Sequence, residues 1–444
     1  MARLDMIHPS CSAYRSAGDR MKIAIIGTGI AGNVAAYKLR RDHEITVFEA
    51  AAYVGGHTNT VDVFENGRRF AVDTGFIVFN DRTYPNFIGL LDEIGQQSQV
   101  SEMTFSVQSE ASTLEYSGSS LNALFTQRRN LLRPSFHRMI REILRFNSEA
   151  LETASQVDDA QTLGDYLSAN GYGHEFVDHY LVPMAAAIWS AEPVSILDMP
   201  VAFLIRFFAN HGLLQLKDRP TWRVIEGGSR EYVNKLVAGH RDRIRLNSPV
   251  RAVRRIGDSV ELQSDTSERE LFDCVFFACH SDQALALLKD PTRTECEVLG
   301  AIRYQPNEAI LHSDASLMPK RRRAWAAWNY HIPEDRNRHV AVTYNMNILQ
   351  GLDAENQYCV TLNSEQNIDP KKIIRRVQYE HPIYSRDAVA AQQRQADLNA
   401  GRTFFCGAYW RNGFHEDGVV SALNAVEHFE QGLANAKLHL QRAS

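Results

Sequence analysis

The sequence lacks any long apolar run. Nowhere in its 444 residues is there the stretch of roughly 18 apolar residues that a membrane-spanning helix needs. The longest candidate, 200–209, is too short and contains Arg206. Residues 1–20 also lack the continuous apolar segment of a secretory signal, so we expect a disordered leader or residues upstream of a start at Met21. These absences predict a cytoplasmic protein.

Cysteine pairs and an excess of positive charge are also missing. The six cysteines form no CxxC pair and no metal-like grouping with histidine, which predicts reduced thiols and no metal site. A formal net charge of −5 argues against nucleic acid as a partner. The length is sufficient for two domains with substantial cores.

The strongest positive signal is a strand, turn, helix and strand near the N-terminus. An apolar run at 23–26 leads into a glycine-rich turn and a helix-like run, and a second strand at 45–48 ends at Glu49. This order is typical of a βαβ unit that binds the phosphates of a dinucleotide. The residues of the turn that we expect at the cofactor are Gly27, Gly29, Ile30, Ala31 and Gly32.

Each of these residue types has a mechanical reason to be there. Gly27 permits the tight turn, Gly29 lets the backbone approach a pyrophosphate, and Gly32 lets helix and strand pack closely. The helix N-terminus turns its free N–H groups toward the phosphate charge. The Glu49 carboxylate lies where a ribose 2′-hydroxyl is held, and an acid there disfavours a 2′-phosphate.

Later motifs favour FAD over NAD, which shares this opening. A glycine pair and the segment 72–76 follow at distances that suit backbone along a flavin. Near the C-terminus, 403–407 predicts a strand and 417–422 a turn opening a helix, whose N-terminus suits the far end of a long cofactor. The cofactor residues predicted from these motifs are Gly55, Gly56, His57, Thr58, Gly75, Phe76, Ile77, Gly407, Gly418, Val419 and Ala422.

At these motifs the chain resembles the flavin-containing amine oxidase superfamily, which includes monoamine oxidases, protoporphyrinogen oxidase, phytoene desaturases and a bacterial fatty-acid double-bond isomerase. It is more closely similar to a bacterial subgroup of FAD/NAD-binding oxidoreductases through the phrases at 55–60, 72–80, 278–284 and 413–418. The resemblance spans about 21–429. It links the chain to modification of unsaturated or methyl-branched fatty acyl chains, including a dehydrogenation toward furan fatty acids.

The resemblance implies an α/β fold, with an FAD-binding Rossmann-like cofactor domain of the GR2/amine oxidase type and an inserted α+β substrate domain. We expect the discontinuous cofactor domain at 21–83, 217–284 and 400–444, and the substrate domain at 84–216 and 285–399. The first insert has a mainly helical pattern and the second a strand-like one. The resemblance also implies that Val250 offers backbone groups to adenine and that Ala278 stands where a buried strand ends beside the cofactor.

Two departures from the superfamily pattern concern cofactor binding. Many members carry an arginine near the phosphate where this chain has 50–53, Ala-Ala-Ala-Tyr, and an acid where it has Ala408. Backbone groups and helix dipoles must then neutralise the phosphates. Cys406 lies at the small-residue position of the strand and not at the attachment site of monoamine oxidases, which predicts non-covalent FAD.

The sequence shows no paired carboxylates and no nucleophile-base set, which fits hydride chemistry at flavin N5 without a dedicated acid or base. Asn80 and Tyr84 follow the turn at 75–77 and are candidate substrate-side polar groups. Tyr409 and Trp410 form an aromatic pair, either beside the flavin or in the core.

Two histidines each have two alternative roles. His57 either contacts FAD or caps backbone groups. For His280, we favour a helix cap over a cavity-facing role.

Three further segments concern the substrate side and its surroundings. Trp325, Trp328 and Tyr330 alternate on a predicted strand that would line the substrate cavity or pack in the core. The basic run 320–323 is typical of a solvated turn. Segment 127–146 predicts a basic amphipathic surface helix, which either binds anionic lipid headgroups or packs one face on the core.

The sequence thus favours an FAD-dependent oxidoreductase that dehydrogenates a hydrophobic or lipid substrate, a methylated or unsaturated fatty acyl chain. Oxygen or a quinone would reoxidise the flavin. The protein would contact the inner face of the membrane peripherally. An amine oxidase, an FAD-dependent fatty-acid double-bond isomerase and a non-catalytic flavin- or lipid-binding protein remain open alternatives.

Overall fold

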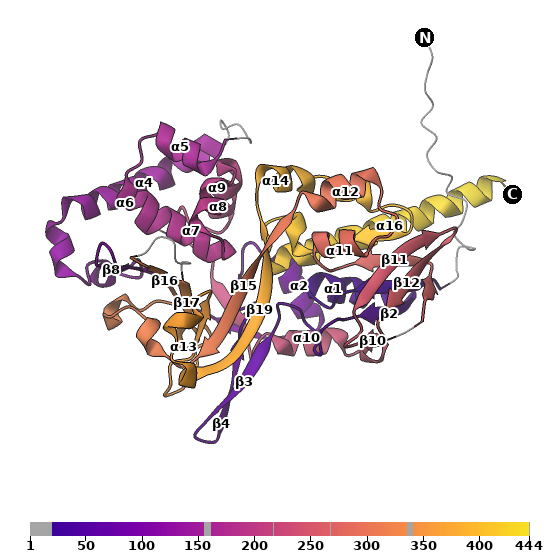
Figure 1. Cartoon of the computed structure of the whole chain (residues 1–444), viewed down its shortest axis with the longest axis horizontal. Helices are drawn as coiled ribbons and strands as arrows, with labels where there is room; N and C mark the ends of the chain where they lie inside the picture. Colours follow the sequence, from indigo (N-terminus) through magenta and orange to yellow (C-terminus); the bar gives the residue numbers. More distant parts are fainter. Residues whose placement is uncertain (1–19, 155–160, 216, 267, 335–340, 444) are drawn as a thin grey trace, which may run out of the picture. The chain divides into compact units, whose positions relative to one another are not determined.

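The computed structural model describes residues 20–154, 161–215, 217–266, 268–334 and 341–443. The chain forms two compact units (Figure 1). Unit 1 comprises the residues up to Gly56, Leu236–Ala301 and the residues from Ala391, and unit 2 comprises His57–Lys235 and Ile302–Ala390. The predicted leader at 1–20 lies outside the described residues except for Arg20.

Unit 1 is built on a five-stranded parallel sheet in the order β10-β2-β1-β14-β20. Its strands are β1 (Lys22–Ile26), β2 (Glu44–Phe48), β10 (Ile244–Arg245), β14 (Cys274–Phe277) and β20 (Thr403–Phe405). The predicted strands at 23–26 and 45–48 are confirmed. The carboxyl ends of all five strands meet at one edge, where open α/β sheets bind ligands.

Two helices of unit 1 pack on each other beside this sheet. They are α1 (Ile30–Leu39), which connects β1 to β2, and α16 (His415–Ala443), in yellow in Figure 1. A separate antiparallel sheet contains β11 (Val250–Ile256), β12 (Ser259–Ser264) and β13 (Glu270–Phe272). Helices α11 (Ser281–Leu287) and α12 (Arg293–Gly300) pack against each other.

The C-terminal motif differs from its prediction at both ends. Strand β20 ends at Phe405, so Cys406 and Gly407 follow it and do not lie within it. Helix α16 begins at His415, which places Asp417 in the first turn of the helix and not in a turn before it. The reason is that the Asp417 carboxylate accepts the backbone N–H groups of Asn412 (3.2 Å) and Phe414 (2.9 Å), and so orders the preceding loop.

Unit 2 contains a seven-stranded mixed sheet in the order β19-β15-β18-β17-β16-β7-β8. The strands are β7 (Phe105–Ser109), β8 (Leu114–Ser117), β15 (Arg303–His312), β16 (Trp328–Ile332), β17 (Ala341–Asn345), β18 (Cys359–Leu362) and β19 (Ile373–Ile383). Strands β7 and β8 come from the insert with the mainly helical pattern, and β7 joins the sheet by pairing in parallel with β16. The sheet therefore unites both inserts.

The remaining elements of unit 2 are helices and short strands. Figure 1 shows the helices together at one end of the unit: α4 (Pro134–Ala154), α5 (Leu163–Ala169), α7 (Val182–Trp189), α8 (Pro193–Leu197) and α9 (Val201–Asn210). The hairpin β3 (Thr60–Glu65) and β4 (Arg68–Asp73) stands apart from a small sheet of β5 (Val78–Asn80), β6 (Ser98–Val100) and β9 (Trp222–Ile225). Helix α2 (Pro85–Glu93) follows β5.

By packing, residues 57–83 and 217–235 belong to unit 2, whereas the predicted cofactor domain includes them. That domain is defined by contact with the cofactor, so its boundaries stay a prediction.

Two local predictions in unit 2 are wrong. Strand β16 begins at Trp328, and Trp325 instead follows the 3-10 turn η5 (Arg322–Ala324), with its indole N–H donated to the Pro319 carbonyl at 2.7 Å. Segment 127–146 is not one helix. It contains the 3-10 turn η1 (Arg128–Leu132), an extended Arg133 and then α4, because Pro134 disfavours a helical conformation in the residue before it.

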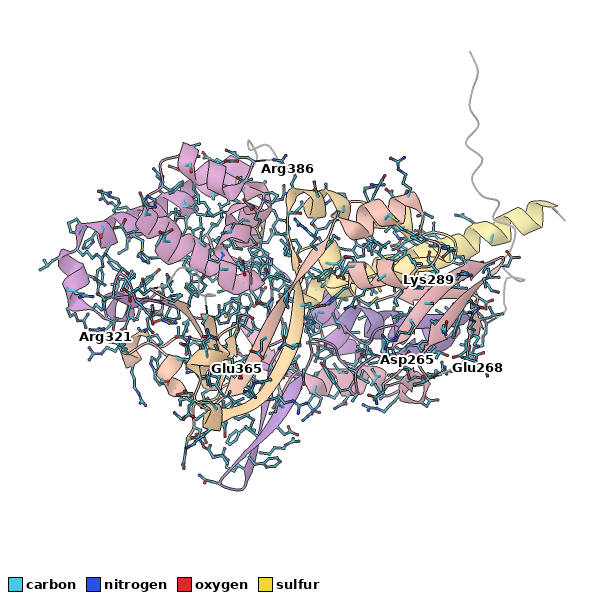
Figure 2. All side chains as sticks on the ribbon, viewed as in Figure 1. Asp265, Glu268, Lys289, Arg321, Glu365 and Arg386 are labelled. Carbon is cyan, nitrogen blue, oxygen red and sulfur yellow. The ribbon has the colours of Figure 1, made fainter. Side chains whose placement is uncertain are left out.

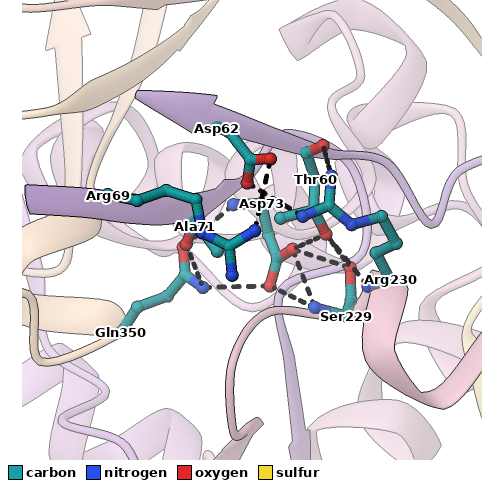
Figure 3. Close-up of polar contacts among 8 residues, drawn as sticks. All are labelled: Thr60, Asp62, Arg69, Ala71, Asp73, Ser229, Arg230 and Gln350. Carbon is teal, nitrogen blue, oxygen red and sulfur yellow. Dashed lines mark hydrogen bonds and ion pairs between the residues drawn. The ribbon is translucent and has the colours of Figure 1, made fainter. Parts of the chain in front are cut away.

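A buried carboxylate ties several elements of unit 2 together (Figure 3). Asp73, fully buried at the end of β4, accepts hydrogen bonds from Thr60 Oγ1 (2.6 Å), from the Ser229 N–H (2.9 Å) and Oγ (2.7 Å), and from Gln350 Nε2 (3.0 Å). The Gln350 side-chain oxygen accepts the N–H of Asp73 itself (2.9 Å). The β3–β4 hairpin, the start of α10 (Arg230–Val237) and the end of α13 (Met346–Leu349) are thereby joined.

Burial raises the pKa of the Asp73 carboxyl to about 6, and the hydrogen bonds from Thr60 and Ser229 only partly oppose this effect. A carboxyl whose pKa is raised by folding stabilises the folded state below its unfolded pKa. That contribution is lost as the pH rises through the folded pKa.

We therefore predict a pH-dependent stability difference between the wild type and Asp73→Asn, since asparagine does not titrate. Relative to the variant, the wild type should lose on the order of 3 kcal/mol of unfolding free energy between about pH 4 and pH 7. Urea denaturation at both pH values measures this change. Asp62→Asn, at a partly exposed carboxylate nearby, is the control. The prediction is wrong if the unfolding free energy of the wild type, relative to that of Asp73→Asn, stays constant or increases between the two pH values.

Candidate functional site

The turn between β1 and α1 brings three backbone segments of unit 1 into close approach. A Cβ on Gly32 would lie 2.0 Å from the Gly27 carbonyl oxygen, and one on Gly27 would lie 2.8 Å from the Ala278 carbonyl oxygen. Gly27 also has a φ of 102°, which disfavours any side chain. Glycine is thus required at both positions, and Ala278, directly after β14, lies against the turn.

Gly29 is different because space is open beside it. A Cβ there would meet no atom within 4 Å. Gly29 is also the N-cap residue of α1, so no N-cap side chain covers the first N–H groups of the helix. The glycine pair at 55–56 lies next to it: a Cβ on Gly56 would be 3.0 Å from Gly29 Cα, and the Gly55 N–H donates to Thr28 Oγ1 at 3.3 Å. The start of α1 is therefore bordered by glycine backbone, which suits a phosphate.

The Glu49 carboxylate is held at the end of β2. It accepts the N–H of Thr28 (2.9 Å), the Thr28 hydroxyl and the N–H of Ala51 (2.8 Å). A carboxylate has about four acceptor positions, so these three donors leave capacity for a ligand hydroxyl. The chain before Val250 lies beside it, since the Ser248 N–H donates to the Glu49 carbonyl at 2.8 Å.

A second helix N-terminus lies against the first. A Cβ on Gly418 would be 2.5 Å from Ile30 Cγ2, so glycine lets the starts of α16 and α1 touch. Ser421 connects α16 to the chain after β20, since its hydroxyl accepts the Gly407 N–H (2.9 Å) and donates to the Gly418 carbonyl (3.1 Å). Two positive helix ends side by side favour an anion. Ala31 lies at this contact, and Val419 and Ala422 are buried in α16.

These features of unit 1 fit the adenosine diphosphate part of FAD. Glu49 would hold ribose hydroxyls, the start of α1 would hold the pyrophosphate, and the backbone at Val250 would face adenine. Thr28 and Ser421 were missed in the sequence. Thr28 lies within the glycine motif and could have been found there, whereas the role of Ser421 depends on α16 folding back to Gly407.

A second group of predicted residues gathers in unit 2 around Gly75. A Cβ on Gly75 would lie 2.1 Å from the His57 carbonyl oxygen and 3.0 Å from Tyr379 Oη. The N–H of Phe76 donates to the same His57 carbonyl at 2.7 Å. Glycine at position 75 therefore lets this turn close onto His57 and onto strand β19.

Strand β19 adds two side chains that the sequence did not indicate. The His57 ring stacks on Tyr379 with centroids 4.7 Å apart and an interplanar angle of 23°, and lies 5.3 Å from the His381 ring. Thr74 Oγ1 lies 3.1 Å from Tyr379 Oη, and Asn307 Nδ2 lies 2.9 Å from His381 Nδ1. We call His57, Tyr379 and His381 the histidine-tyrosine cluster. No local motif signals it, because more than 300 residues separate its parts.

Other predicted residues of unit 2 have packing contacts. The Thr58 hydroxyl lies 2.7 Å from Tyr232 Oη, while Phe76 packs edge-on against Phe87, and Ile77 is buried. The Asn80 side chain accepts the N–H groups of Arg82 and Thr83, so it orders the turn after β5.

Tyr84 packs edge-on against Phe79 and Phe87. These contacts account for Asn80 and Tyr84 structurally, and their contact with a substrate stays a prediction.

Tyr409 and Trp410 are buried in unit 1, with ring centroids 5.1 Å apart. A Cβ on Gly407 would lie 2.3 Å from the Tyr409 ring, so this ring covers Gly407. The Gln392 amide donates to the Tyr409 carbonyl at 2.8 Å. The pair thus belongs to the packing around the end of β20, and its contact with the flavin stays a prediction.

Two further residues bear on the cofactor. Burial raises the pKa of the Cys406 thiol, which keeps it protonated and poorly nucleophilic. This supports the prediction of non-covalent FAD. His280 is the N-cap of α11, and its N–H donates to the Gln283 side chain at 3.4 Å, in agreement with the favoured capping role.

We predict that Gly29→Glu abolishes flavin retention in a folded protein. The space beside Gly29 admits a side chain without a clash, but a carboxylate there would occupy and repel the pyrophosphate position. Flavin absorbance per protein after gel filtration measures the effect, and far-UV circular dichroism verifies folding. Gly118→Glu, at another open glycine, should retain flavin. A yellow, fully loaded Gly29→Glu protein would contradict the assignment.

Comparison with solved structures shows the same fold. Putrescine oxidase bound to putrescine has a TM-score of 0.64 at 16% identity, with 93% of this chain and 99% of that chain covered. A fatty acid isomerase from P. acnes that produces CLA has a TM-score of 0.64 at 15% identity, with 92% and 98% covered. A putative protoporphyrinogen oxidase from Exiguobacterium sp. 255-15 has a TM-score of 0.67 at 16% identity, with 94% and 100% covered.

Among curated protein sequences, none matches the chain. The family model described as flavin containing amine oxidoreductase matches residues 30–312, which is more than half of the sequence. That match includes Glu49, the glycine pair at 55–56, the turn at Gly75 and strand β14, which ends directly before Ala278. The chain belongs to the flavin-containing amine oxidoreductase family and is an FAD-dependent oxidoreductase.

Proposed function

We propose that the chain dehydrogenates a hydrophobic substrate, specifically a methylated or unsaturated fatty acyl chain. When bound, FAD supplies a hydride acceptor at N5 and passes two electrons to oxygen or a quinone. The fatty acid isomerase from P. acnes, which has the same fold, is an instance of an acyl substrate on this scaffold.

The observation that carries the proposal is a cluster of buried aromatic rings in unit 2, one of which directly follows strand β19. Trp189 on α7 packs against Phe207 on α9, with ring centroids 4.7 Å apart. Phe203, also on α9, stacks on Tyr384 at 4.9 Å and 22°. Tyr384 directly follows β19, which carries Tyr379 and His381 on one face because alternate residues of a strand point the same way. Aromatic surroundings of this kind suit an apolar chain.

The histidine-tyrosine cluster would serve the second half of the reaction. Forming a C=C bond removes a hydride from one carbon, which goes to the flavin, and a proton from the adjacent carbon, which needs a base. Asn307 donates to Nδ1 of His381, and its own side-chain oxygen accepts from Asn363 at 2.7 Å, which fixes this orientation. Neutral His381 then carries its proton on Nε2. We assign the role of the base to His57, whose ring lies beside that of His381.

We predict that His57→Gln slows substrate-dependent flavin reduction by about 10²–10⁴-fold, the usual contribution of a general base. Flavin content should remain unchanged, and stopped-flow absorbance under anaerobic conditions measures the rate. His280→Gln, at a helix-capping histidine, is the matched control and should keep the wild-type rate. An unchanged rate in His57→Gln would remove His57 from the chemistry.

The test of the substrate class is an anaerobic absorbance scan of the purified protein. Membrane lipid extract, methylated fatty acids and a panel of amines are added separately. We expect methylated fatty acids or the lipid extract to bleach the flavin band, since only an oxidisable substrate transfers a hydride. Bleaching by amines alone would overturn the proposal in favour of an amine oxidase, the reaction that the likeness to putrescine oxidase suggests.

Two other outcomes would also overturn it. A shifted double bond in an added fatty acid, formed without any electron acceptor, would identify an isomerase. Lipid that binds while the flavin stays oxidised and the lipid unchanged would identify a carrier.

A further inference from the structure

A surface of unit 2 combines exposed leucines with a high density of positive charge. Leu121 is 77% exposed, Leu131 50% and Leu132 88%. They lie on the short helix α3 (Leu121–Leu124) and on η1. Isolated apolar residues are common on protein surfaces, but two adjacent exposed leucines on one turn indicate an interaction site. The Arg128 side chain on this turn donates to Asn122 on α3 and to the Phe125 carbonyl directly after it, so the third leucine lies on an element that contacts η1.

The same segment is strongly basic. No aspartate or glutamate occurs between Gly118 and Arg141. The arginines of this segment are Arg128, Arg129, Arg133, Arg138 and Arg141. All except the partly buried Arg133 are exposed. The patch is therefore positive in a chain whose net charge is −5.

A second basic segment, distant in sequence, lies against the first. The Glu115 carboxylate on β8 accepts a hydrogen bond from Arg321 (2.9 Å) and from the Lys320 N–H (3.3 Å). The Glu115 N–H in turn donates to Gln127 Oε1 at 3.2 Å, directly before η1. Turn η5 packs against both α3 and β8. The exposed run 320–323 is thus added to the arginines of the first segment, and Figure 2 labels Arg321 at this end of unit 2.

The carboxylate that joins the two basic segments is not exposed. Glu115 is buried and paired with Arg321. Arg322 lies over the Trp325 ring, with its guanidinium carbon 5.1 Å from the centroid, which holds the basic run in a defined position. We call the leucines at 121, 131 and 132, the five arginines and the run 320–323 the basic-leucine surface.

We propose that the basic-leucine surface docks on an anionic lipid bilayer. The leucines would insert among the upper acyl chains, while arginine and lysine side chains would contact the headgroup phosphates. Charge complementarity selects an anionic partner, and the exposed leucines select one with an apolar layer directly beneath its charge. A nucleic acid offers phosphates but has no need of the leucines.

Docking of this kind is peripheral. Within the described residues, no helix is both long enough and apolar enough to cross a bilayer. The inference goes beyond the proposed reaction and does not depend on it, because vesicle binding is measured without turnover. An amine oxidase or a carrier with this surface would bind vesicles equally well.

The experiment is flotation of the flavin-loaded protein with vesicles of phosphatidylcholine alone or with added phosphatidylglycerol. Two double variants test the two components of the surface: Leu131→Ser with Leu132→Ser, and Arg322→Ser with Arg323→Ser. Leu271→Ser, at a leucine 55% exposed on β13, controls for loss of an exposed leucine. Lys289→Ser with Arg386→Ser, at exposed positions that do not belong to the basic-leucine surface, controls for loss of charge.

We expect the wild type to bind the phosphatidylglycerol vesicles, and to bind less as salt is raised. The leucine variant should bind at least about tenfold more weakly, since two large apolar side chains leave the membrane. The arginine variant should also bind on the order of tenfold more weakly. Both controls should bind as the wild type does, and every variant should retain flavin and its far-UV spectrum because all the changed residues are exposed.

Three results would overturn the proposal. One is equal binding of wild type to both vesicle types, and another is no binding to either. The third is binding that the leucine variant retains and that heparin abolishes, since this would identify a polyanion site without membrane insertion.

Discussion

The close approach of backbone at Gly32 is the constraint on which the architecture of unit 1 depends. Because a side chain at this position would overlap the Gly27 carbonyl, α1 can lie directly against the end of β1 only with glycine there. Gly418 plays the same part for α16, which meets α1 at Ile30. The absence of two side chains thus places two helix N-termini together at the carboxyl edge of the sheet. With FAD bound, these positive helix ends would balance the phosphate charge, because no arginine occurs at 50–53.

Unit 2 depends on a different interaction, the buried carboxylate of Asp73. Four donors from Thr60, Ser229 and Gln350 converge on it, which compensates in part for the cost of removing a charge from water. The chain then passes to Gly75, which closes onto His57 and Tyr379. A structural carboxylate therefore precedes by two residues the turn that carries the proposed chemistry, so rigidity at one supports placement at the other.

Charge is distributed unevenly along this chain. A net charge of −5 argues against a general affinity for anions, yet arginines are concentrated between Arg128 and Arg141 and again at 320–323. Glu115 brings these two segments together and is itself buried. The overall charge is therefore a poor guide to the local surface, which depends on which strand and turn lie side by side.

The sequence by itself determined the family, the cofactor and the first βαβ unit of unit 1. The glycine turn after β1, the acid at Glu49 and the strand before Ala278 appear as predicted, although α1 already begins at Ile30, within the glycine motif. These features are local, because short-range sterics and continuous apolar runs are properties of consecutive residues. The exact start of α16 and the loss of Trp325 from strand β16 could not be read this way. Each depends on a side-chain hydrogen bond: the Asp417 carboxylate accepts the Phe414 N–H, and the Trp325 indole N–H is donated to the Pro319 carbonyl.

Only the tertiary structure decided which distant side chains meet. His57 meets Tyr379 at the turn of Gly75, which closes onto strand β19, and the run 320–323 joins the arginines of η1 through Glu115. Sequence spacing carries no information on such contacts, since strand pairing across hundreds of residues is selected by the burial of whole sheets. The family and its cofactor thus follow from local motifs, whereas the proposed base, the aromatic cluster beside β19 and the basic-leucine surface follow from long-range packing.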